Sequence, residues 1–261
     1  NLKGGSSMDG EIAHVPSLPH PLQWRPETIT HLRSAMNVLA ILRDAWFFYS
    51  RHFLTIVRLC LPLILLESAT RLALDHWLGE NVLPALDLLV GLIFYPLYVG
   101  ALILYLDARS RGHDPALRAV YARALPLWPA LAVLSGLGSL LIMLGASLFV
   151  LPGIWVMVKI AFAEYLLVLR GLTPLAALKE SFALTRGHFL LILGCVMTVL
   201  LPIWMLEIWI AAQLFAEQTP PLLPAMLLDA VVGLLQLLPT IMLFRCFMLC
   251  TEPPTRQPDN G

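Results

Sequence analysis

Residues 127–170 read LWPALAVLSGLGSLLIMLGASLFVLPGIWVMVKIAFAEYLLVLR, which is two apolar runs separated by Leu151-Pro152-Gly153. A helix needs about 20 residues, at about 1.5 Å each, to cross about 30 Å of hydrocarbon. The runs 127–150 and 154–170 approach or exceed this length. A turn as short as Leu-Pro-Gly forces consecutive helices to run antiparallel. The stretch therefore predicts a transmembrane hairpin with its turn at residues 151–153.

The same kind of apolar run occurs along most of the chain. Of 261 residues, 59% are hydrophobic and only 13% are charged, too few polar groups to cover a water-soluble domain. Six runs are long enough to cross a membrane: 53–75, 82–106, 127–150, 154–170, 188–212 and 222–247. We therefore predict an all-α integral membrane protein with six transmembrane helices.

The ends of the chain differ from this membrane domain. Residues 1–35 hold four prolines and no helical apolar period, so we expect a disordered N-terminal extension. Residues 1–7 resemble a cloning remnant, and we expect the natural start at Met36, with Met8 as the alternative. The six-helix membrane domain is expected over 36–250, and residues 251–261 form a C-terminal tail.

Basic residues are confined to alternate connections, and such residues are retained on the cytoplasmic side of short loops. The connections at 75–81, 151–153 and 216–221 contain no lysine or arginine. Both termini are therefore expected in the cytoplasm, with the protein in a bacterial inner membrane. The basic residues of the opposite connections are Arg25, Arg33, Arg43, Arg51, Arg109, Arg111, Arg118, Arg123, Arg170, Lys179, Arg186 and Arg256.

Short matches at slowly drifting offsets indicate an internal repeat. Residues 52–54 (His-Phe-Leu) match 188–190, and 87–92 (DLLVGL) match 229–234 (DAVVGL). A weaker middle copy starts at Arg111-Gly112. Each copy would hold an amphipathic interfacial helix and two crossings, which gives three parallel repeats. Chance similarity among leucine-rich segments is the alternative.

Six ionisable residues within the apolar runs form a candidate intramembrane polar cluster. Charges in hydrocarbon are costly, so such residues are functional candidates. The predicted topology puts all six in the outer third of the membrane, where they either line a cavity or form ion pairs that hold the helices together. Glu164 lies deeper. The six residues are Glu67, Arg71, Asp87, Lys159, Glu207 and Asp229.

Signals of catalysis are missing from the sequence. No zinc-protease, nucleophile-elbow, phosphate-loop or dinucleotide-binding motif occurs. The four cysteines, Cys60, Cys195, Cys246 and Cys250, lie in apolar runs without metal-site spacing. With 17 basic and 17 acidic residues, the balance of charge does not favour nucleic acid as a partner. We expect a non-enzymatic protein without metal or cofactor.

Two segments carry a resemblance to a known family. They are 151–164, with Leu-Pro-Gly-Ile-Trp and Ala-Phe-Ala-Glu, and 177–188, with Ala-Leu-Lys-Glu-Ser-Phe-Ala-Leu-Thr-Arg-Gly-His. They resemble the YciC-type family of bacterial inner-membrane proteins and, more distantly, the membrane domain of some glycerophosphodiester phosphodiesterases. The resemblance covers about residues 36–250. It implies location and fold, but no substrate and no functional residues.

Two functions are favoured by these patterns over a third, an intramembrane lipid enzyme, for which no nucleophile or metal set is visible. One is a non-enzymatic module that interacts with membrane lipids or partner membrane proteins. The other is a small-molecule transporter or channel that uses the polar cluster. Convergence of the cluster on a cavity would favour transport, whereas full pairing in a dry core would favour the module. The sequence leaves the oligomeric state open.

Overall fold

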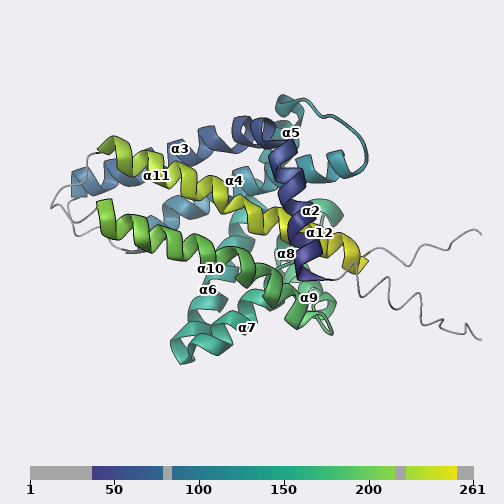
Figure 1. Ribbon diagram of the computed structural model, residues 1–261. Coiled ribbons are helices and arrows are strands. Elements are labelled where there is room, and N and C mark those ends of the chain that lie inside the picture. The colour runs from purple at the N-terminus through teal and green to yellow at the C-terminus, as the bar shows by residue number, and fades with distance from the viewer. Residues whose placement is uncertain (1–36, 79–83, 215–221, 252–261) are drawn as a thin grey trace, which may run out of the picture.

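The computed structural model describes residues 37–78, 84–214 and 222–251 (Figure 1). The predicted N-terminal extension, the natural start and nearly all of the C-terminal tail lie outside these residues. Within them, six helical segments are long and apolar enough to cross a membrane. They match the six predicted runs and confirm an α-helical, multi-pass membrane protein. They span 53–74, 86–110, 117–148, 150–170, 189–210 and 226–251.

Short breaks divide several of these segments into separate helices. The first crossing is α3, the second α4, and the third α6, which continues from α5 through the 3₁₀ turn η2. The fourth crossing joins α7 to α8, the fifth is α10, and the sixth joins α11 to α12. The bounds are α2 Val38–Arg51, α3 Phe53–Leu78, α4 Pro84–Ser110, α5 Leu117–Ala124, η2 Leu125–Leu127, α6 Trp128–Leu148, α7 Val150–Ile160, α8 Ala163–Arg170, α9 Pro174–Leu184, α10 Phe189–Leu214, α11 Leu222–Leu235 and α12 Leu237–Thr251.

Three short helices, α2, α5 and α9, precede the odd-numbered crossings at the positions where amphipathic segments were expected. In α2, Ile41, Ala45 and Tyr49 are buried at i, i+4 and i+8, whereas Trp46 and Phe47 are exposed. This spacing puts the buried residues on one helical face. That face packs across α10 and α12 at one end of the bundle, as Figure 1 shows.

The hairpin turn differs from its predicted position. Phe149 alone is extended between α6 and α7, and Pro152 and Gly153 lie in the first turn of α7. Proline is tolerated there because the first helical N–H groups have no partner within the helix. A Cβ on Gly153 would lie 3.0 Å from the Cβ of Ala146. The Leu-Pro-Gly segment therefore serves close packing of α7 on α6 rather than the turn itself.

The six crossings form a closed ring. In chain order, α3 packs against α4, α4 against α6, α6 against α7, α7 against α10, and α10 against α12, and α11 returns to α3. Two glycines permit close approach to α3. A Cβ on Gly233 of α11 would lie 2.8 Å from Ile64, and one on Gly91 of α4 would lie 3.3 Å from Arg71. The interior of the ring is therefore bounded on all sides by helices.

Side chains of the even-numbered crossings fill one end of this interior. We call this cluster, which includes Tyr105, Tyr165 and Phe247, the plug. α4 packs against both α8 and α12. Tyr165 of α8 stacks on Phe247 of α12 with ring centroids 5.6 Å apart, and its hydroxyl donates to the Thr240 carbonyl at 2.7 Å. Tyr105 of α4 is also fully buried there. The plug closes the ring at the end where α2, α8 and α9 gather (Figure 1).

Prolines lie within several crossings, and aromatic side chains donate to carbonyls close to two of them. Proline removes one N–H, which leaves the carbonyl four residues earlier without its usual donor and kinks the helix. The carbonyl of Leu59, three residues before Pro62, accepts from the Tyr121 hydroxyl. The carbonyl of Ile93, three residues before Pro96, accepts from the Trp128 indole at 2.8 Å. These two breaks in α3 and α4 are therefore used for packing, with donors from α5 and α6.

Two buried tyrosines of the plug allow a matched test of its hydrogen bond. We expect Tyr165→Phe to lower the free energy of unfolding by about 1 kcal/mol, because the Thr240 carbonyl loses a donor. Tyr105→Phe is the control, since the Tyr105 hydroxyl makes no hydrogen bond to a described residue. Thermal unfolding in detergent would measure both. Equal stability of the two variants would contradict the assignment.

Candidate functional site

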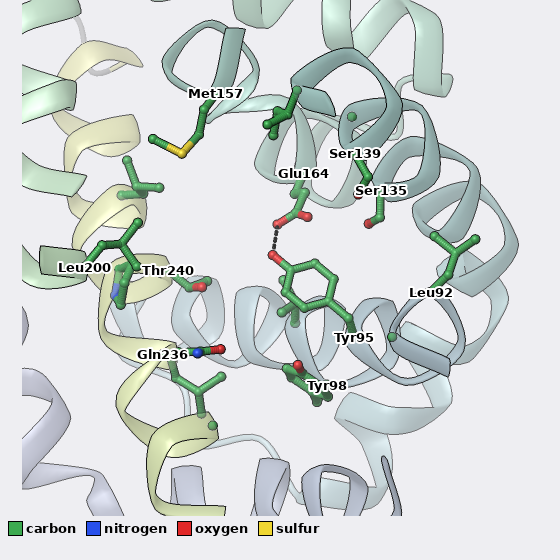
Figure 2. Close-up of a pocket in the computed structure, with 18 of the residues that line it drawn as sticks. Leu92, Tyr95, Tyr98, Ser135, Ser139, Met157, Glu164, Leu200, Gln236 and Thr240 are labelled. Atoms are coloured by element: carbon green, nitrogen blue, oxygen red, sulfur yellow. Dashed lines mark hydrogen bonds between the residues drawn. The ribbon is translucent and has the colours of Figure 1, made fainter. Parts of the chain in front are cut away.

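A cavity of about 700 Å³ occupies the interior of the ring beyond the plug. Its lining comes from all six crossings and combines apolar walls with carboxyl, hydroxyl and amide groups, several of which are drawn in Figure 2. The volume lies within the range of small-molecule sites. Five of the six residues of the predicted polar cluster line it: Glu67, Arg71, Asp87, Glu207 and Asp229.

Arg71 of α3 is shared between two of these acids. Its Nη2 lies 2.8 Å from Oε1 of Glu67, one helical turn earlier, and its Nε lies 3.1 Å from Oδ1 of Asp87 on α4. The absence of a side chain at Gly91, one turn after Asp87, leaves room for the guanidinium. Glu67 is buried, whereas Arg71 and Asp87 are about half exposed. This arrangement joins the first two crossings at the rim of the cavity.

Asp229 and Glu207 have no cationic partner among the described residues. The Asp229 carboxylate accepts a hydrogen bond from the Ser68 hydroxyl at 2.9 Å, which joins α11 to α3. Glu207 of α10 makes neither a hydrogen bond nor an ion pair to any residue that the structure describes. Carboxylates without cations attract positive charge. The rim therefore carries acidic groups that are free to bind a cation.

Lys159 lies apart from the other five residues. Its amine is 5.8 Å from the centre of the Trp155 ring on the same helix, and its carbonyl accepts from the Ser181 hydroxyl of α9 at 2.7 Å. Lys159 sits in the last turn of α7, beside α9, rather than near the hairpin tip. Lys159 therefore does not line the cavity with the other five residues.

A second polar group, Glu164, lies at the end of the cavity next to the plug, which we call the floor. Glu164, in the first turn of α8, accepts a hydrogen bond from the Tyr95 hydroxyl of α4 at 3.4 Å. Figure 2 shows these two side chains pointing toward one another across the cavity, with Gln236 and Thr240 on the facing side. The sequence marks Glu164 and Gln236 only as single polar residues in apolar runs. Their convergence depends on the fold.

Both even-numbered crossings that are divided into two helices break beside this floor. The fourth crossing is interrupted at Ala161 and Phe162, and the sixth at Gln236. Ala161 and Gln236 both line the cavity. A break in a helix leaves backbone carbonyls without their usual partners, and such groups are tolerated in a membrane where they line a cavity. At two of these carbonyls the missing donor comes from another helix, because the Lys159 carbonyl accepts from Ser181 of α9 and the Leu234 carbonyl accepts from the Tyr49 hydroxyl of α2.

Small residues of α6 also reach the cavity. The spacing of Ser135 and Ser139 predicts a close helix contact, yet both residues line the cavity (Figure 2). The Ser135 hydroxyl has no hydrogen-bond partner among the described residues. Gly136, on a neighbouring position of the helix, does pack closely, because its Cβ would lie 3.4 Å from Leu92. The α6 wall thus holds a buried hydroxyl without a described partner beside the cavity.

The chain is similar to curated bacterial membrane proteins. It is 26% identical over 160 residues to the UPF0259 membrane proteins of Yersinia pestis and Yersinia pseudotuberculosis, and the match covers 59% of this chain. The aligned part spans 59% of the length of those relatives. No family profile and no solved structure matches the chain. These findings support a distant relation to an uncharacterised family of bacterial multi-pass membrane proteins.

The shared ion pair at the rim allows a test of its contribution to stability. We expect Arg71→Gln to lower the free energy of unfolding by about 1–3 kcal/mol, because two acids lose their cation while Glu67 stays buried. The double variant Arg71→Gln with Glu67→Gln should regain part of this loss. Arg245→Gln, whose guanidinium lies 3.8 Å from Asp44, is the control. Unchanged thermal unfolding of Arg71→Gln would contradict the assignment.

Proposed function

We propose that the protein is a transporter of a small organic cation in the bacterial inner membrane. The observation that carries this proposal is the charge of the cavity. Its described lining holds five carboxyl groups and a single guanidinium, and that guanidinium is engaged by two of the acids. An acidic, partly enclosed site of this kind concentrates cations and disfavours anions.

The walls of the cavity indicate an amphiphilic ligand. Between the acidic rim and Glu164 at the floor, the lining is largely apolar, with Leu92, Met157 and Leu200 among the residues that Figure 2 labels. Apolar walls with a few convergent polar groups are typical of small-molecule sites. We therefore expect a positively charged group at an acidic side chain and an apolar body against the walls.

The divided crossings support transport over a purely structural role. Transporters use discontinuous helices at the midplane to present backbone groups to substrate and ions. Here the breaks at Ala161 and Gln236 line the same cavity. A module that only holds the bundle together would instead pair its charged groups, whereas Glu207 and Asp229 have no cationic partner among the described residues.

The proposal also includes the internal repeat, the location of the termini and the family type that the sequence predicts. The order of a short helix and two crossings occurs three times along the chain. This order supports three parallel repeats. We propose that both termini are cytoplasmic, that the chain is of the YciC type, and that it is not an enzyme. Contacts of α2, α5 and α9 with lipids or partner membrane proteins would accompany transport.

A pair of ions with one shape and opposite charge tests the proposal. We expect the purified protein to bind tetraphenylphosphonium and not tetraphenylborate in equilibrium dialysis. Glu207→Gln should weaken the binding of tetraphenylphosphonium by about tenfold, which is about 1.4 kcal/mol, because an unpaired carboxylate is lost.

Asp44→Asn is the control, since Asp44 lies on α2 outside the cavity. Equal affinity for both ions would contradict the proposal, as would binding that Glu207→Gln leaves unchanged. Saturable uptake of the cation into vesicles that contain the protein would then separate a transporter from a binding module.

A further inference from the structure

Glu164 is the one carboxyl group at the floor of the cavity among the described residues, and its surroundings contain no cation that faces it. It is partly exposed, and it lines the cavity between the α7–α8 break and the plug. Its hydrogen-bond partner is the Tyr95 hydroxyl, a neutral donor. The nearest acids and the guanidinium of Arg71 belong to the rim, where Arg71 is held by Glu67 and Asp87.

The elements packed around Glu164 contribute neutral groups. α4 brings the phenols of Tyr95 and Tyr98, α6 brings serine hydroxyls, and Tyr165 follows on α8 itself. The facing break brings the Gln236 amide, and α12 brings the Thr240 side chain. α9 brings Leu178, and α10 brings apolar residues and, at the rim, the acidic Glu207. The nearest basic residue in the sequence, Lys159, directs its amine to the Trp155 ring. No described element therefore supplies a counter-ion.

A carboxylate without a counter-ion in such surroundings is costly, and the group avoids this cost by keeping its proton. A bound organic cation would change the balance, because the cation itself becomes the counter-ion. Opposite charges attract more strongly beside the apolar walls of the cavity than in bulk water, because the local dielectric constant is lower there. The proton and the cation are thus alternatives at the same carboxyl group.

We propose, on the basis of the proposed function, that Glu164 exchanges its proton for the organic cation, which makes the protein a proton-coupled antiporter. In the step, the O–H bond of the Glu164 carboxyl group breaks, and both electrons stay on the carboxylate oxygen. The proton leaves through the cavity to bulk water, and the cation takes its place. No redox change and no further reactant are involved. The Tyr95 hydroxyl positions the carboxyl group and donates to it in either state.

The exchange requires that the affinity for the cation rise with pH. Binding releases one proton, so acid competes with the cation, and full coupling changes the dissociation constant by about tenfold for each pH unit. Conversely, bound cation lowers the affinity of Glu164 for its proton by the same factor. This reciprocity follows for any two linked ligands, and competition at one carboxyl group is its limiting case.

The first experiment measures proton release. Tetraphenylphosphonium is added to the purified protein in weakly buffered solution with a pH indicator. We expect about one proton released per cation bound. Glu164→Gln should bind the cation more weakly, through the remaining rim acids, with no release and with no pH dependence. Glu207→Gln is the matched control, because it should weaken binding and keep the release. Proton release that persists in Glu164→Gln would overturn the proposal.

The second experiment needs no ligand, so it distinguishes this proposal from the proposed function. Infrared difference spectra between acidic and alkaline buffer should contain a protonated carboxyl band that Glu164→Gln removes and Tyr95→Phe shifts. If the protein binds no organic cation but this band is present, the proposed function fails alone. A wild-type spectrum without the band overturns the proton-exchange site. Competition by sodium instead of acid, lost in Glu164→Gln, would also overturn it, because the site would then be a sodium site.

Discussion

A polar group inside a membrane needs a partner or a wet cavity, and this constraint organises the whole bundle. The effect is visible at single atoms. Carbonyls close to Pro62 and Pro96 accept from the side chains of Tyr121 and Trp128. The carbonyl of Thr240 receives the Tyr165 hydroxyl within the plug. At these places polar backbone is satisfied by protein, and the helices pack closely.

In the interior beyond the plug, polar groups face a cavity instead of a protein partner. There the Ser135 hydroxyl has no partner among the described residues, Glu207 has no cation, and two helix breaks face the same space. Unsatisfied groups on this scale are compatible with a cavity that holds water or a ligand, and not with a dry core. The contrast between plug and cavity is therefore the main physical argument for a binding function. The excess of acidic groups at the rim then favours a positively charged ligand.

Most of the fold could be predicted from the sequence, because the length of an apolar run is set directly by the thickness of the membrane. The six crossings follow from this length. The short helix before residue 53 follows instead from the helical spacing of its apolar residues. The turn after α6 could not be placed, since Pro152 is as compatible with a first helical turn as with a loop. Local patterns do not distinguish these two roles.

The site was only partly predictable. Charged residues in apolar runs pointed to Glu67, Arg71 and Asp87, whose contacts are local or join neighbouring crossings. The sequence groups Lys159 with these residues because few residues separate it from the predicted turn at 151–153. The structure instead places the backbone of Lys159 against α9. The pairing of Glu164 with Tyr95 links positions 69 residues apart. Such a contact follows from the closure of the ring and has no signature in a single sequence.

The central claim is that the space within the ring is accessible to water and to cations, and cysteine labelling tests it directly. With the four native cysteines replaced by alanine, Ser139→Cys and Val133→Cys place thiols on different sides of α6, one toward the cavity and one on the exposed apolar surface. In lipid nanodiscs, a cationic, membrane-impermeant thiosulfonate should modify residue 139 rapidly and residue 133 very slowly. Similar rates at both positions, or no modification at residue 139, would contradict the account.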